Sequence, residues 1–348
     1  MSKHIHKVMI NQMNNEEETY TYTYNFAHTK NVTLTVQHNA VCIEAALGKV
    51  YDKNEMMTKD AYLFPDALRK ALLIHIMKFS ENITIHTMSV SIDDQQEMVI
   101  DTAQGDEKPI YSLVDGKIEP IDDWNDDEIQ SILSQPKSAA DPRMAALYAY
   151  ITSKSKHYKA EKFIYLWMAL NGMYNYFAGK VASYCNSKKE AGDMLKICCL
   201  LKLFKYGNET IYKKAQTKIA QDVGSLLKKN NYKCITKDSL YLGENMELAA
   251  KIEEILNKPD SNMKFDITAY GYLLMQFSYY IRCNVIHADK PLALFSYKND
   301  EEMIYLQVVN SLLDEFMEEN LHKWFDKKYI VYLEERAKEI ADEISNKK

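Results

Sequence analysis

One short segment holds the residues of this chain that are best suited to chemistry on a phosphodiester. It reads Arg282-Cys283-Asn284-Val285-Ile286-His287, with Lys290 three residues further on. The chain has only four arginines, so an arginine in an apolar, helix-like run indicates a need for its planar fork of donors, which grips phosphate in a way that an ammonium cannot. A nearby imidazole can transfer protons near neutral pH. These residue types favour phosphodiester chemistry.

A plainer interpretation of the same residues stays open. Arg282 and His287 lie about 140° apart on an ideal helix, so they do not automatically share a face, whereas Asn284 and His287 do. Pro291 favours a helix end just after His287, because the residue before a proline is pushed out of helical geometry. His287 would then be a helix C-terminal residue favoured by the helix dipole, and Arg282 a member of an ion pair.

The segment resembles the signature of the HEPN superfamily, in which four to six residues separate an arginine from a histidine. It is most similar to the Apea-like bacterial subgroups that read Arg-Cys-Asn-x-x-His-Gly-x-Lys, although this chain has Ala288 where glycine is usual. Residues 162–174 are similar to the opening core helix of those subgroups. The resemblance covers residues 140–348 at most.

The resemblance implies an all-α bundle that often forms a homodimer, with two copies of the Arg–His helix making one composite cleft. Known active members are endoribonucleases that need no metal or cofactor, and some act in toxin and phage-defence systems. His287 would act as general base or acid, and Arg282 would stabilise charge in the transition state. Asn284 would hold the imidazole or the phosphate, and Lys290 would add a contact to the substrate, single-stranded RNA.

A second function is implied by the same resemblance: a non-catalytic HEPN-like scaffold, or a regulator that binds nucleotides or RNA. Many family members lack demonstrated activity, and the net charge of −6 is unusual for a dedicated RNA binder. The Arg282 and His287 pair favours the nuclease, since a pure scaffold needs neither residue.

Length and composition predict an ordinary soluble protein of two domains. The chain has 348 residues, of which 47% are hydrophobic and 26% charged. It contains no apolar run of about 18 residues and begins without a signal-peptide pattern. Its six cysteines show no metal-ligand spacing, which is typical of reduced thiols in a cytoplasmic protein. Cys283 is accordingly interpreted as a buried thiol rather than a nucleophile.

Charge is distributed unevenly along the chain. Residues 1–140 carry 12 basic and 22 acidic side chains, residues 141–240 carry 18 and 7, and residues 241–348 carry 13 and 20. The positive middle block is a candidate surface for a polyanion. An equally good interpretation is that its lysines lie on solvated helix faces and bind no ligand.

The residue pattern of the N-terminal part predicts an α+β domain at residues 1–125. Its role is unknown, and it could bind a regulatory partner. Alternation predicts strands at 19–26, 31–37, 41–47, 82–92 and 97–101, and helical spacing predicts a helix at 66–79. His4 and His6 are expected to lie in a frayed terminus.

A linker at residues 126–141 and an all-α, HEPN-like bundle at 142–348 follow. Asn125 could cap a short helix at 126–134, and Asp141-Pro142 predicts the start of the first bundle helix. Further helices are expected at 142–154, 158–185, 188–204, 209–229, 244–257, 265–288, 299–322 and 326–346. Trp167, Tyr174 and Phe177 have the spacing of core residues rather than of a base-stacking platform.

Overall fold

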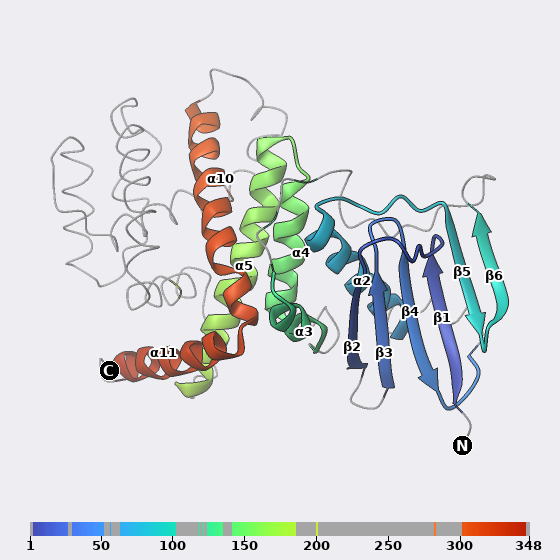
Figure 1. Cartoon of the computed structure of the whole chain (residues 1–348). Helices are drawn as coiled ribbons and strands as arrows, with labels where there is room; N and C mark the ends of the chain where they lie inside the picture. The colour runs from blue at the N-terminus through green and yellow to red at the C-terminus, as the bar shows by residue number, and fades with distance from the viewer. Residues whose placement is uncertain are drawn as a thin grey trace. The chain divides into compact units, whose positions relative to one another are not determined.

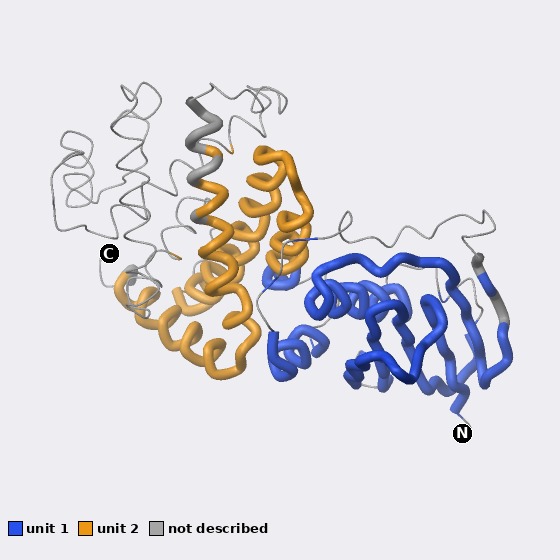
Figure 2. Tube along the Cα trace, turned by 45° about the horizontal axis from the view of Figure 1, so that its top comes forward, with its two compact units in different colours: residues 1–144 blue, residues 145–348 orange. Residues whose placement is uncertain are grey.

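The chain folds into two compact units, residues 1–144 and residues 145–348, in a computed structural model (Figures 1 and 2). The structure describes residues 3–26, 30–51, 63–101, 124–134, 141–185 and 301–345, and the single positions 56, 118, 121, 200 and 282. Each unit is described by itself below.

The first unit is built on one antiparallel sheet of six strands. The strands are β1 (His4–Ile10), β2 (Tyr20–Phe26), β3 (Lys30–Val36), β4 (Val41–Leu47), β5 (Thr87–Ile92) and β6 (Gln95–Asp101). Their order across the sheet is β2-β3-β4-β1-β5-β6, and every neighbouring pair is antiparallel. Strands β2 to β6 correspond to the five strands that alternation predicts, and β5 begins at Thr87 rather than at residue 82.

Strand β1 corrects the expectation of a frayed N-terminus. It lies in the interior of the sheet, where it pairs with β4 on one side and β5 on the other. Val8 and Ile10 are fully buried, and so is the side chain of His6. The sequence does contain the alternation typical of a strand, because these three residues alternate with Lys7 and Met9. Two histidines and a lysine nevertheless give the segment a polar composition.

Helix α2 (Leu63–Phe79) packs on one face of this sheet (Figure 1). Strand β3 shows why, because Val32, Leu34 and Val36 are buried while Thr33 and Thr35 are only half-buried on the other face. A strand that alternates in this way buries one face only, so the helix covers the apolar side and the threonines remain near solvent.

Helix α3 (Asp126–Ser134) begins with a reciprocal cap. The backbone N–H of Glu128 donates to Asn125 Oδ1 at 2.9 Å, and the N–H of Asn125 donates to Glu128 Oε2 at 3.0 Å. This arrangement satisfies two helix-end donors at once. The helix is the one predicted from Asn125, and it occupies the first part of the segment predicted as a linker.

This helix packs against β2, which is an edge strand of the sheet. Gln130 Nε2 donates to the carbonyl of Thr23 at 2.9 Å, and Tyr22 Oη donates to Asp126 Oδ1 at 2.9 Å. An edge strand exposes unpaired backbone groups that other chains can join, and a covering helix removes that hazard. Residues 126–134 therefore belong to the first unit by their contacts.

In the second unit, the described residues form helices and no strands. These helices are α4 (Pro142–Lys154), which contains the boundary between the units, α5 (Lys159–Tyr184), α10 (Glu301–Asn320) and α11 (Lys327–Ser345), with a short 3-10 turn η4 (His322–Phe325). These match four of the predicted helices to within two residues at each end. The helices predicted at 188–204, 209–229, 244–257 and 265–288 lie outside the described residues, apart from Leu200 and Arg282, which are both helical.

Helix α5 is the central element of these, with α10 and α11 packed against it. The side chains of Trp167, Tyr174 and Phe177 are at most 3% exposed. The prediction that they form core rather than a platform for stacked bases is confirmed. Among the described residues, no helix is both long enough and apolar enough to cross a membrane.

Two buried histidines fix loops onto the sheet unit. His6 Nε2 accepts the backbone N–H of Tyr51 at 3.1 Å, so the ring proton lies on Nδ1, 3.1 Å from the carbonyl of His4. His75, in the last turns of α2, faces the carbonyls of His38 and Glu81 at 2.8 and 3.0 Å. Burial lowers the pKa of both His6 and His75, chiefly because an imidazolium loses its hydration there.

We expect the sheet unit to lose stability on mild acidification. The pKa of each buried histidine lies below its unfolded value of about 6.5, so the stabilisation is complete above that pH and disappears as pH falls through the folded-state pKa. Protonated His6 can no longer accept from Tyr51. Hydrogen exchange of β1 and α2 amides at pH 5.0 and 7.5 measures the effect.

The double variant His6→Gln/His75→Gln should flatten this pH dependence, because glutamine keeps an amide oxygen and NH2 but does not titrate. His86→Gln, which alters an exposed histidine of the same unit, is the matched control. An unchanged pH dependence in the double variant would assign the effect to other groups.

Candidate functional site

Arg282 is the one predicted catalytic residue that the structure describes. It has helical backbone geometry and a half-buried side chain. Asn284, His287 and Lys290 lie outside the described residues, so the geometry that would join them to Arg282 stays a prediction. Helical geometry at Arg282 agrees with the helix predicted at 265–288 at this position.

The second unit contains a buried charged cluster where α4, α5 and α10 meet. Lys154, whose side chain is only 3% exposed, lies 2.9 Å from Asp314 Oδ1, and Lys162 lies 2.8 Å from Asp314 Oδ2. Glu318 adds a second carboxylate 3.8 Å from Lys154. One carboxylate thus joins the last residue of α4 to the first turns of α5, and all three helices converge on it.

The cluster is supported by an amide of the same helix. Asn310 is 6% exposed, and its Nδ2 donates to the carbonyl of Lys159 at 2.7 Å. Asn310 and Asp314 are one turn apart on α10, so one face of α10 holds the start of α5 through both a hydrogen bond and an ion pair. The sequence singled out neither residue; the available signal is an acidic pair, Asp314-Glu315, between the apolar residues 312–313 and 316–317.

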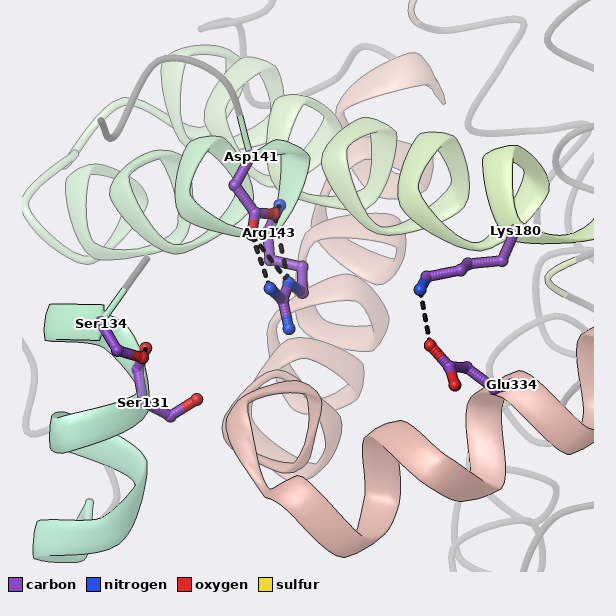
Figure 3. A network of polar contacts seen from close by, with 6 residues as sticks. All are labelled: Ser131, Ser134, Asp141, Arg143, Lys180 and Glu334. Carbon is purple, nitrogen blue, oxygen red and sulfur yellow. Dashed lines mark hydrogen bonds and ion pairs between the residues drawn. The ribbon is translucent and has the colours of Figure 1, made fainter. Parts of the chain in front are cut away.

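These contacts reduce the positive surface available on the described part of residues 141–240. Lys154 and Lys162 are bound to Asp314, and Lys180 donates to Glu334 Oε1 of α11 at 2.7 Å (Figure 3). The pair with Glu334 raises the pKa of Lys180. Much of this charge is therefore neutralised within the unit, which favours the solvated-surface alternative for this stretch.

An aromatic and basic surface does remain between α4 and α5. Tyr158 is 68% exposed, and Lys156 lies over the ring of Tyr165 with its Nζ 5.6 Å from the centroid. His157 is exposed beside them. Aromatic and cationic groups in this combination can contact single-stranded nucleic acid, but the carboxylates of the neighbouring cluster limit the local positive potential.

Arg143 shows how this chain uses a guanidinium. Its Nε lies 3.1 Å from each carboxylate oxygen of Asp141, and its Nη2 lies 2.6 Å from Oδ2 (Figure 3). Asp141 Oδ1 also accepts the backbone N–H of Arg143 at 2.8 Å, at the start of α4. Both side chains are nearly buried. Arg143 therefore helps to fix the start of α4.

The sheet unit offers no reactive thiol and no metal site among its described residues. Burial raises the pKa of the Cys42 thiol to about 11, so the nucleophilic thiolate is scarce at neutral pH. His38 pairs with Glu81 at 2.7 Å and His4 with Asp93 at 2.6 Å. In the described ranges of both units, no group of three or more His, Cys, Asp or Glu residues is arranged to hold a metal ion.

Replacing Asp314 by asparagine should destabilise the helical unit by about 2 kcal/mol, because the buried Lys154 would lose its nearest carboxylate and keep Glu318 at 3.8 Å. The matched control is Glu334→Gln, which breaks an exposed ion pair of the same helix α5 and should cost about 1 kcal/mol or less. Hydrogen exchange of the α5 amides compares the two changes in one helix. Equal small effects in both variants would show that the buried cluster contributes no more than a surface pair.

The chain matches no family model, and neither a curated protein nor a solved structure is similar to it. A functional assignment therefore depends on the residues of this chain alone.

Proposed function

We propose that the C-terminal part of this chain is a metal-independent endoribonuclease of HEPN type. The observation that carries the proposal is the spacing of Arg282, Asn284 and His287 in a segment whose arginine has helical geometry. The segment similar to the HEPN opening helix is consistent with this, since Trp167 and Tyr174 of α5 are buried. The all-α bundle over residues 142–348 is part of the proposal.

The chemistry requires nothing beyond the residues named and the RNA itself. His287 removes the proton of a ribose 2′-hydroxyl, whose oxygen forms a bond to the adjacent phosphorus. The bond from phosphorus to the 5′-oxygen breaks, and that oxygen takes a proton from the acid form of an imidazole. Arg282 stabilises the charge on the equatorial oxygens in the transition state. The products are a 2′,3′-cyclic phosphate and a 5′-hydroxyl.

The alternative is a non-catalytic scaffold or RNA-binding regulator of the same family. One structural observation favours it: Lys154, Lys162 and Lys180 are held by carboxylates of α10 and α11, which weakens the attraction of the described helices for a polyanion. The nuclease is preferred because a scaffold has no use for both Arg282 and His287.

Purified full-length protein should cleave single-stranded RNA in the presence of EDTA. The variant His287→Ala should lose about 10²-fold or more in rate, the scale of lost acid–base catalysis. His86→Ala, which removes an exposed histidine of the sheet unit, is the control and should leave the rate unchanged.

A substrate with a single 2′-deoxy ribose at the cleaved position tests the nucleophile directly, and it should resist cleavage there. A requirement for a divalent metal, or full activity of His287→Ala, would contradict the mechanism. Binding of RNA without cleavage by the wild-type protein would favour the scaffold or regulator.

The proposed composite cleft also requires a twofold homodimer. Ile281, Val285 and Ile286 surround the polar motif with apolar side chains, which indicates a surface buried against a second copy near residues 280–295. Light scattering at micromolar concentration should therefore give a mass near twice 40.4 kDa. A monomer would argue against the cleft, as would a dimer in which cross-linking places the two His287 positions far apart.

A further inference from the structure

The two edge strands of the sheet differ in the charge that their sequences carry. Strand β6 contains the acidic residues Glu97 and Asp101, whereas β2 reads Tyr-Thr-Tyr-Thr-Tyr-Asn-Phe and contains no charged residue, proline or glycine. Charge on an edge strand opposes pairing with another chain, and an uncharged run of strong strand formers favours it. Of the two edges, β2 is therefore the one that is suited to pair with a further strand.

Helix α3 bonds to a backbone group of β2 that such a strand would use. Gln130 Nε2 donates to the carbonyl of Thr23 at 2.9 Å. On its other side Thr23 lies opposite Thr33 of β3, and the two hydroxyl oxygens are 3.4 Å apart, consistent with a pair whose backbone groups point away from each other. The carbonyl of Thr23 thus faces out of the sheet, toward the place of a further strand.

The sequence of β2 is nearly palindromic about Thr23. In an antiparallel pair of two β2 strands centred on this residue, Tyr22 lies opposite Tyr24, and Thr21 lies opposite Asn25. Opposite residues point to the same face, so the buried tyrosines would meet on one face and the exposed polar residues on the other. Aromatic pairs and threonine pairs of this kind stabilise a sheet. The edge therefore complements a second copy of itself.

We propose that β2 is a pairing edge for the β2 strand of a second copy of this chain, and that α3 keeps this edge closed. The two arrangements exclude each other, because Gln130 occupies the Thr23 carbonyl that the second copy needs. Release of α3 would let two chains join about a twofold axis at Thr23. The proposal is independent of the nuclease.

The contacts of α3 explain why the edge is closed in the native chain. Ile129 and Ile132 are fully buried, and the carbonyl of Leu133 accepts from Lys70. The helix has only 9 residues, fewer than the roughly 12 that an isolated helix needs in water, so it depends on these contacts. Weakening them should therefore release the whole helix.

The triple variant Asn125→Ala/Ile129→Ala/Gln130→Ala tests the role of α3. It removes the helix cap, a buried apolar side chain and the bond to β2. Light scattering of the full-length variant at micromolar concentration should give twice the mass of wild type. The mass is compared with wild type, so the result does not depend on whether residues 280–295 already form a dimer.

Hydrogen exchange shows whether the variant changes only the intended part. The α3 amides should lose protection, while those of β3 and β4 keep it. If the triple variant unfolds the sheet, the milder variant Tyr22→Phe/Gln130→Ala takes its place, because it removes only two hydrogen bonds between α3 and β2.

The added change Thr23→Lys should return the mass to the wild-type value, because it places two like charges opposite each other at the twofold axis. Thr35→Lys is the matched control, since Thr35 lies on the same face of the sheet but in β3, and it should leave the doubled mass unchanged. A variant with α3 released and the wild-type mass would overturn the proposal. A doubled mass that Thr23→Lys does not lower would also overturn it, by assigning the association to another surface.

Discussion

The energetic cost of removing an ammonium group from water determines where several elements of this protein meet. A buried lysine is tolerated only if carboxylates or carbonyls replace its hydration. In the sheet unit Lys70 satisfies this through Asp66 in its own helix and the carbonyl of Leu133 in α3, at 3.1 Å each. In the helical unit Lys154 depends on Asp314. The positions of α3 on the sheet and of α10 beside α4 and α5 follow from these requirements together with apolar burial.

The same requirement explains why several lysines of the helical unit pair with carboxylates inside that unit. Lys154, Lys162 and Lys180 are neutralised inside their own unit, so they stabilise helix packing more than they attract a polyanion. In the described part of residues 141–240, the sequence charge therefore overstates the positive surface that is left for a polyanion.

Arginine use within the chain supports a special role for a guanidinium. Arg143 holds both oxygens of Asp141 with its fork, and Arg336 pairs with Glu339 while its guanidinium carbon lies 5.3 Å from the centroid of Tyr332. Bidentate and stacked contacts of this kind cannot be reproduced by lysine. Both of these arginines pair with a carboxylate of their own unit, so an ion-pair role for Arg282 stays open beside the proposed contact with phosphate.

Local sequence rules determined most of the described elements. Strands such as β3 and β4 follow from alternation, because a sheet with one buried face requires it, and α3 begins where Asn125 can cap it. Tertiary structure alone decided the rest. The polar β1 became an interior strand because its neighbours bury His6, Val8 and Ile10, and Asp314 became the junction of three helices through partners more than 150 residues away. The contacts of Lys30 and Lys49 with Tyr51 likewise form only once β3 and β4 pair. The sequence did not predict them, because long-range contacts of this kind leave no periodic pattern in the chain.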